Sequence, residues 1–159
     1  MDIETFLRRA KSLENFRTIG RQVRAGEVAW IETELGIALP RTYRDLLVHV
    51  GWIGWFGNSI FGIEDGSEHG TVEWTISERA SLAKYPQSFP PLPNEGNIIA
   101  EIFGGGFCFL YSMESKRAGQ ISAHAPDERY REVQYWTGLE DYFDYLIDGV
   151  ENWHPAAFV

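Results

Sequence analysis

The sequence predicts an α+β fold in which a mostly antiparallel or mixed β-sheet is backed by helices from the N-terminal and C-terminal parts of the chain. Two observations lead to this prediction. Apolar residues follow helical spacing near both ends, whereas the middle of the chain holds short apolar runs separated by turn residues. The strand candidates are grouped rather than alternating with helices, which disfavours a βαβ arrangement. The 159 residues suit one sizeable core, so we expect a single domain over residues 1–159.

Three helices are expected in the first third of the chain. Asp2 stands where an N-cap belongs, before the helical pattern of residues 3–10. After an irregular connection, a second helix ends at Gly36, which occupies the C′ position. Pro40 is expected at the first position of a third helix, which Gly51 ends.

The middle of the chain changes from helical to extended patterns. Residues 52–63 are rich in aromatic residues and glycine and are expected to be extended, with turns. Residues 71–85 return to helical spacing, and the proline-rich residues 86–97 form a connector, because each proline removes a backbone donor. Four strands are then expected, over residues 97–103, 107–112, 119–124 and 130–136.

The last helix is expected to begin with a capping box. Thr137 and Glu140 have the required three-residue spacing. The helix that follows has an apolar side that includes Phe143 and an opposite side rich in aspartate. Gly149 is expected to close it.

Residues 100–112, AEIFGGGFCFLYS, place three glycines beside the only cysteine of the chain. A phosphate-binding loop leads into a helix N-terminus, and the Walker form also carries a Gly-Lys-Ser/Thr sequence. Here the glycines lead into a strand pattern with no lysine nearby, so a tight hairpin turn is the simpler interpretation. Cys108 lies among bulky apolar residues without a local base, and we interpret it as a core residue rather than a nucleophile.

Other familiar catalytic patterns do not occur in the sequence. The four histidines lack metalloprotease spacing, and one cysteine cannot form a cysteine-type zinc site, so no metal and no cofactor are predicted. Adjacent carboxylates are common, and a hydrolase with a dispersed carboxylate site, using Glu64 or Asp127, remains an alternative. The balance of these patterns predicts a protein that is not an enzyme.

The charge of the chain is −9 and is concentrated in one part of the sequence. Residues 1–45 carry eight basic and seven acidic side chains, whereas residues 46–159 carry six and sixteen. Such a surface repels nucleic acid and anionic membranes and attracts a basic partner. The alternative is that the acidity only keeps the protein soluble. The single cysteine, the charged N-terminal stretch and the lack of a long apolar run predict a cytoplasmic protein.

Aromatic residues gather next to the acidic loop of residues 64–70. Trp52, Trp55 and Phe56 precede this loop, and Trp74 follows it. Aromatic anchors beside a carboxylate-rich rim are typical of an interface for a basic protein. The alternative is that Trp52 and Trp55 pack beneath the sheet, and the sequence leaves both interpretations open.

Several segments together resemble the SUKH superfamily. IETELGIALPRTYRDLLVHVG, residues 31–51, resembles its opening motif, in which an acidic helix leads to Leu-Gly-Ile-x-Leu-Pro and then to a second helix. SIFGI, NIIAEIFGGGFCFLYS, GQISAH and YWTGLEDYFDYLIDGV resemble its following strand, its glycine-turned hairpin, its last strands and its C-terminal helix. The resemblance is strongest over residues 25–150.

The resemblance implies an α+β domain with a non-enzymatic function. Bacterial members of the superfamily are typically immunity proteins that neutralise secreted or contact-delivered toxins, often nucleases, and fungal members include regulators of cell-wall assembly. We therefore expect an immunity protein whose partner is a basic toxin, with a regulatory protein-binding module as the alternative. The sequence does not indicate an oligomeric state. The partner-binding residues expected are Glu64, Asp65, Glu68, Glu73, Asp127 and Glu128 as charges, with Trp55, Phe56 and Tyr130 as anchors.

Overall fold

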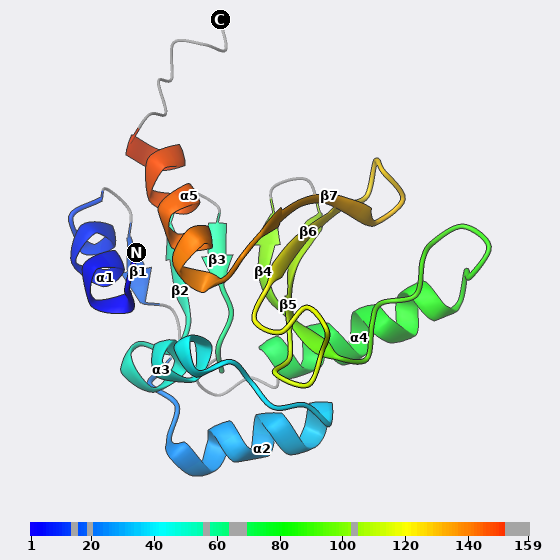
Figure 1. The fold of residues 1–159 in the computed structure, drawn as a ribbon, viewed down its shortest axis with the longest axis horizontal. Coiled ribbons are helices and arrows are strands. Elements are labelled where there is room, and N and C mark those ends of the chain that lie inside the picture. The colour runs from blue at the N-terminus through cyan, green and yellow to red at the C-terminus, as the bar shows by residue number, and fades with distance from the viewer. Residues whose placement is uncertain (14–15, 19–20, 56–57, 64–69, 103–104, 152–159) are drawn as a thin grey trace, which may run out of the picture.

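The structure is a computed structural model, and it describes residues 1–13, 16–18, 21–55, 58–63, 70–102 and 105–151. The described part is an α+β domain (Figure 1). Its elements are α1 (Ile3–Lys11), β1 (Arg17–Thr18), α2 (Ala25–Leu35), α3 (Arg41–His49), β2 (Ile53–Trp55), β3 (Asn58–Ile60), α4 (Thr71–Ala83), β4 (Gly96–Ile102), β5 (Gly106–Tyr111), β6 (Ile121–Ala125), β7 (Arg131–Trp136) and α5 (Leu139–Glu151).

The described strands form one sheet of seven strands in the order β1-β2-β3-β4-β5-β6-β7. Each strand pairs antiparallel with the next strand along the chain. The expected α+β fold is therefore confirmed, and of the two expected sheet types the structure has the antiparallel one. The edges of this sheet are β1, with two residues, and β7, with six.

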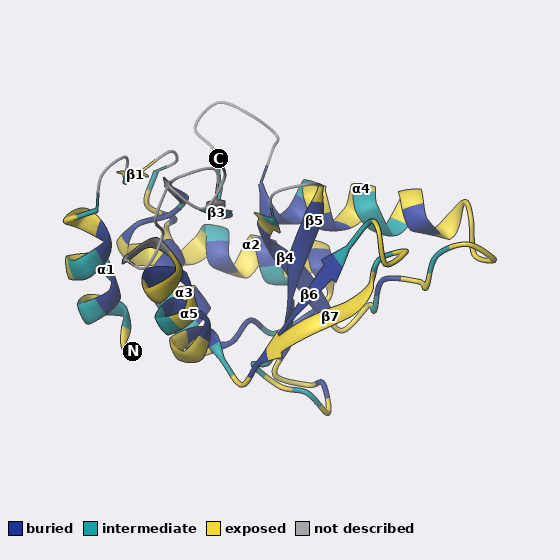
Figure 2. Cartoon of the chain, turned by 90° about the horizontal axis from the view of Figure 1, so that it is seen from above, coloured by how far each residue is buried: buried dark blue, intermediate teal, exposed yellow. Residues whose placement is uncertain are grey.

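Each face of the sheet has its own apolar core. The larger core joins one face to α1, α2, α3 and α5. In it the rings of Phe6 and Phe143 stack with centroids 4.0 Å apart, where α1 and α5 lie side by side (Figure 1). The smaller core lies on the opposite face, where Leu82 of α4 and Leu92 of the proline-rich connector cover Phe107 and Phe109 of β5. Strand β7 lies at the border of the sheet and is exposed along most of its length (Figure 2).

The expected helix ends are largely confirmed. Asp2 caps α1, because its carboxylate accepts a hydrogen bond of 2.9 Å from the Thr5 amide. Gly36 follows α2 with a left-handed φ of 65°, as expected at a helix C-terminus. Pro40 is the N-cap of α3 and not its first residue, and α3 ends at His49, two residues before Gly51.

The two described glycines of the triplet, Gly105 and Gly106, lie at a hairpin, as expected; Gly104 lies outside the described residues. Strands β4 and β5 pair antiparallel from Gly96 opposite Tyr111 to Ile102 opposite Gly106. The connection between them includes Gly105, whose φ of 86° favours glycine. The residue after the triplet continues β5 and does not begin a helix, which removes the basis for a phosphate loop here.

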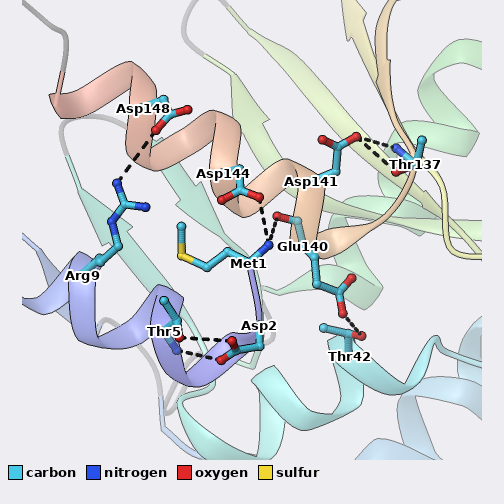
Figure 3. A network of polar contacts seen from close by, with 10 residues as sticks. All are labelled: Met1, Asp2, Thr5, Arg9, Thr42, Thr137, Glu140, Asp141, Asp144 and Asp148. Atoms are coloured by element: carbon cyan, nitrogen blue, oxygen red, sulfur yellow. Dashed lines mark hydrogen bonds and ion pairs between the residues drawn. The ribbon is translucent and has the colours of Figure 1, made fainter.

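The expected capping box of α5 is wrong, and so is its expected end. The amide and the hydroxyl of Thr137 both donate to the Asp141 carboxylate, at 3.0 and 3.2 Å, and not to Glu140. Glu140 instead accepts a hydrogen bond from the Thr42 hydroxyl of α3 (Figure 3). Gly149 does not end α5, which extends to Glu151. A glycine costs a helix only about 1 kcal/mol relative to alanine, so a single glycine need not end it.

Polar contacts fix α5 against α1. The Met1 amino group donates to the Asp144 carboxylate at 2.9 Å and to the Glu140 carbonyl at 3.0 Å. One turn further, Arg9 and Asp148 form an ion pair at 3.9 Å (Figure 3). These contacts hold the acidic side of α5 toward α1, which leaves the tyrosine-bearing side of α5 to face β7.

Candidate partner-binding groove

A hollow of about 500 Å³ lies between the larger-core face of the sheet and α5. We call it the β7–α5 groove. It is lined by Glu101, Ile102, Gly106, Cys108, Ala123, Ala125, Pro126, Asp127, Val133, Gln134, Trp136, Tyr142, Tyr145 and Leu146. The lining is contributed by β4, β5, β6, β7, the β6–β7 turn and α5, so the groove depends on the register of these four strands.

Small side chains on the sheet leave room for this groove. Cys108 lies opposite Ala123, and Ala123 lies opposite Gln134 on β7. Directly opposed residues of antiparallel strands point to the same face, so these side chains share the floor of the groove. Gly106 and Ala125 extend the same small-residue floor toward the end of the sheet. Larger residues at these positions would fill the hollow.

A β-bulge directs a second β7 side chain into the groove. The pairing runs from Ala123 opposite Gln134 to His124 opposite Glu132, so Val133 has no direct partner on β6. A bulge of this kind breaks the strict alternation of side chains between faces. Val133 and Gln134, although adjacent in sequence, therefore both line the groove. Val133 is 50% exposed, an accessible apolar side chain at the groove mouth.

Three aromatic residues form the wall of the groove on the α5 side. The ring centroid of Trp136 lies 4.8 Å from that of Tyr142 and 4.9 Å from that of Tyr145. Trp136 and Tyr142 are buried, whereas Tyr145 is 49% exposed. The two buried rings hold Tyr145 in place, so the exposed ring is a pre-ordered contact surface with little rotamer freedom left to lose.

The charged groups at the groove are acidic. Asp127 is the carboxylate whose side chain the β6–β7 turn brings to the groove, because Glu101 lies opposite Phe107 and its side chain points to the other face; among the described residues, the lining contains no lysine, arginine or histidine. Asp141 lies four residues before Tyr145 on α5, so these two side chains share one side of the helix. Grouped carboxylates around an apolar hollow produce a negative local potential, which favours a cationic partner.

Cys108 is the candidate nucleophile of the groove floor, and its surroundings suppress that reactivity. The thiol donates to the Tyr142 hydroxyl at 3.5 Å, and burial raises the pKa of the thiol to about 12. A nucleophilic cysteine requires a lowered pKa and a nearby base. The expected role of Cys108 as a core residue is confirmed by its 1% exposure. The groove is therefore suited to binding rather than to thiol chemistry.

The structure brings only part of the expected site to this groove. Asp127 lines it, and Glu128 is the next residue of the same turn and is exposed. Tyr130 lies on the opposite face of the sheet, where its ring stacks on Phe107 with centroids 5.7 Å apart. Glu73 lies in the first turn of α4, which packs on that opposite face, and is partly exposed.

The remaining expected residues fall largely outside the described part of the chain. Phe56, Glu64, Asp65 and Glu68 lie outside it entirely, and for Trp55 only the backbone is described, as the last residue of β2. Of the neighbouring aromatics, Trp52 packs edge-on against Phe61, with centroids 5.1 Å apart, beside the smaller core. Trp74 packs on the same Phe61 ring and is partly exposed.

The aromatic wall was not anticipated from the sequence. Trp136, Tyr142 and Tyr145 lie close in the chain, and only Thr137 and Gly138 separate β7 from α5. The signal that predicts their meeting is the three-residue spacing of the tyrosines on a helix that directly follows the tryptophan. Among the described residues, no three histidine, cysteine or acidic side chains are placed to hold a metal ion. Within the same residues, no helix combines the length and apolarity needed to span a membrane.

The antiparallel sheet and its flanking helices define an α+β domain. The family SUKH_6, described as SMI1-KNR4 cell-wall, matches residues 25–143. The chain therefore belongs to the SUKH superfamily, which includes toxin-immunity proteins. No curated protein matches the chain.

Proposed function

We propose that this protein is an immunity protein, which binds a basic bacterial toxin and neutralises it without chemistry of its own. One observation carries the proposal: the β7–α5 groove combines an apolar aromatic wall with acidic groups, and none of its described lining residues is cationic. The match to a superfamily that includes toxin-immunity proteins supports it, as does the net charge of −9.

The groove would act on the toxin in two physical steps. A toxin that degrades nucleic acid needs a basic surface to hold the phosphate backbone. The negative field of this protein steers such a surface toward it and raises the association rate. Burial of Tyr145 and Val133 against the toxin then slows dissociation, because apolar and aromatic anchors at the centre of an interface contribute most of the binding free energy.

The proposed interface contains the groove and the acidic residues expected from the sequence. At the groove its charged members are Asp127 and Glu128, and its anchors are Val133 and Tyr145. Glu73 and Tyr130 lie on the opposite face of the sheet and form a second proposed contact area. The other proposed charges and anchors are Glu64, Asp65, Glu68, Trp55 and Phe56, whose side chains lie outside the described part of the structure. We place the complex in the cytoplasm and the interface within a single domain over residues 1–159. Asp127 is the member common to the sequence expectation and the groove.

The test begins with the partner. The tagged protein is purified from lysate of its source organism at low salt, and stoichiometric partners are identified by mass spectrometry. The expected partner is basic, binds one-to-one, and arrests growth when expressed alone but not when co-expressed with this protein. Asp127→Lys should weaken that complex and reduce the dependence of its affinity on salt. The control is Lys116→Glu, which reverses a charge at an exposed residue that does not line the groove. A stoichiometric partner without toxicity would contradict the proposal.

The second candidate is a regulatory protein-binding module like the fungal members of the superfamily. The description SMI1-KNR4 cell-wall of the matching family favours it. The same purification separates the two candidates. Recovery of several unrelated, non-toxic proteins without a basic one-to-one partner would support the regulatory module instead.

A further inference from the structure

Strand β7 is an open edge beside the groove. It has six residues, whereas the other edge strand, β1, has two. The side chains from Arg131 to Tyr135 are all exposed, and Tyr135 is 61% exposed. In the described part of the structure, β7 is hydrogen-bonded to β6 on one side and to no strand on the other. An edge of this kind presents unpaired backbone donors and acceptors to a second chain.

We propose that an extended, cationic segment of the toxin pairs with the outer edge of β7 and inserts a side chain into the β7–α5 groove. The inference rests on the proposed function and deepens it, because it specifies how the partner docks. The partner segment would form an eighth strand of the sheet. Backbone hydrogen bonds would supply affinity, and the groove would select the side chain.

The position of the groove makes such docking geometrically direct. Val133, Gln134 and Trp136 belong to β7 and also line the groove. A strand added beside β7 would lie about 4.8 Å away, so it would run along the mouth of the groove. Alternate side chains of that strand would face the same side of the sheet as the groove floor. One of them could then enter the hollow without any change in the path of β7.

The charges favour a cationic segment over a second copy of this chain. Asp127 lines the groove, Asp141 flanks Tyr145, and no lining residue within the described part of the chain is basic. A guanidinium or ammonium group placed against the exposed Tyr145 ring gains a cation–π contact, and the neighbouring carboxylates strengthen it. A second copy would instead bring another acidic groove and another net charge of −9 to the same edge, which opposes association.

Two features restrict pairing at this edge to a matching segment. The bulge at Val133 interrupts the regular pattern of the strand. At the start of β7, Glu132 forms an ion pair with Arg117, with a nitrogen–oxygen distance of 3.2 Å for one of its contacts. Bulges and charges on edge strands discourage indiscriminate pairing. The regular part of the edge is therefore the short stretch over Gln134 and Tyr135, next to the groove.

The experiment uses synthetic peptides, so it does not depend on knowing the toxin. Three blocked nonapeptides alternate valine with arginine, glutamine or glutamate and are titrated into the isotope-labelled protein by NMR. The arginine peptide is expected to shift the amide signals of residues 133–135 and to slow their hydrogen exchange. The glutamate peptide should bind at least about tenfold more weakly, and added salt should reduce the difference.

Proline substitutions then test the backbone pairing. Successive residues of a strand point their N–H groups to opposite sides, so only one of Gln134 and Tyr135 donates outward. Gln134→Pro and Tyr135→Pro are both made, and the one that keeps the wild-type urea midpoint has lost only an outward N–H. That variant should lose arginine-peptide binding. Tyr145→Ala should weaken it about tenfold, and Tyr85→Ala, which removes an aromatic ring that is 60% exposed and does not line the groove, should leave it unchanged.

The outcomes separate the inference from the function on which it rests. Equal binding of the arginine and glutamate peptides, no binding by any peptide, or full binding to the fold-preserving proline variant would overturn the docking mode. If that variant still neutralises a toxin identified by co-purification, the immunity function stands and the edge pairing does not. If the peptides bind as expected but the co-purified partner is harmless, the edge binds cationic strands and the immunity function is wrong.

Discussion

Replacement of Gly51 by alanine should be among the most destabilising single-methyl additions in this chain. Gly51 connects α3 to β2 with a φ of 81°, and a Cβ built there would lie 1.9 Å from the carbonyl oxygen of Arg21. An ordinary contact needs about 3.4 Å, so the two segments would have to separate by about 1.5 Å. That movement strains the bond of 2.9 Å from the Val23 amide to the Leu47 carbonyl and that of 2.7 Å from the Gln22 side chain to the His49 carbonyl.

The magnitude follows from these contacts. A left-handed backbone costs alanine about 1–2 kcal/mol. Weakening one or two hydrogen bonds and overpacking the contact add about 1–3 kcal/mol. The free energy of unfolding of Gly51→Ala should therefore fall by about 3 kcal/mol, a large part of the about 5–15 kcal/mol typical of a domain. With a urea dependence of about 2 kcal/mol/M, the midpoint falls by about 1.5 M.

Two other glycines provide matched controls for the assay, which follows urea unfolding by the fluorescence of the six tryptophans. Gly36 has a φ of 65° but nothing within 4 Å of its added Cβ, so Gly36→Ala should cost only about 1–2 kcal/mol. Gly26 lies in α2, also with nothing within 4 Å, and Gly26→Ala should stabilise by up to about 1 kcal/mol. A Gly51→Ala midpoint equal to the wild-type value, or higher than that of Gly36→Ala, would refute the steric reasoning.

Three further predictions concern buried or half-buried side chains. Lowering the pH from about 7.5 to about 5.5 should reduce the free energy of unfolding. Burial lowers the pKa of His124 below its usual 6.5, so in this pH range the unfolded chain binds a proton that the folded chain does not. His124→Gln should flatten the dependence of the free energy of unfolding on pH, measured by urea titrations at each pH. Arg79→Lys should lower the free energy of unfolding by about 1–3 kcal/mol in the same urea assay. The Arg79 guanidinium donates to the carbonyl oxygens of three residues, in the proline-rich connector and at the start of β4. An unchanged urea midpoint would contradict that role. Cys108 should resist a thiol reagent at about pH 8 in the folded protein and react once the chain is unfolded in urea, and rapid reaction of the folded protein would contradict its burial.

The order and type of the larger elements could be predicted because their patterns are local. The helical spacing before Gly36 and the apolar runs around the glycine triplet each depend on residues within one element. The α5 capping contact could not be chosen from spacing alone. Glu140 has the capping-box position, but α3 lies close enough for Thr42 to bind its carboxylate, and Asp141 takes its place at Thr137. Tertiary contacts decided between two acidic neighbours.

The groove was harder to predict than the elements that build it. The charge pattern included Asp127, which lines the groove, but it grouped Asp127 with Tyr130, which the β6–β7 turn sends to the opposite face. Tyr130 and the preceding Arg129 both have positive φ angles in that turn, and this backbone conformation is not readable from their side-chain types. The bulge at Val133 is equally hidden, because the β7 sequence gives no sign that two adjacent side chains face one groove.

In the proposed immunity function, the acidic surface and the groove would make different contributions to recognition, because charges act at a distance and the groove acts on contact. Under that proposal, rim carboxylates such as Asp127 would accelerate association with any basic partner, and the effect would fall as salt rises. They do not distinguish one basic toxin from another. The ring of Tyr145 and the edge of β7 act only on contact, and shape and backbone register set the dissociation rate. Substitution of Asp127 should therefore change the association rate and its salt dependence, whereas Tyr145→Ala should change mainly the dissociation rate. Equal effects of both substitutions on the association rate would mean that the groove contributes electrostatic attraction and not shape complementarity to the toxin.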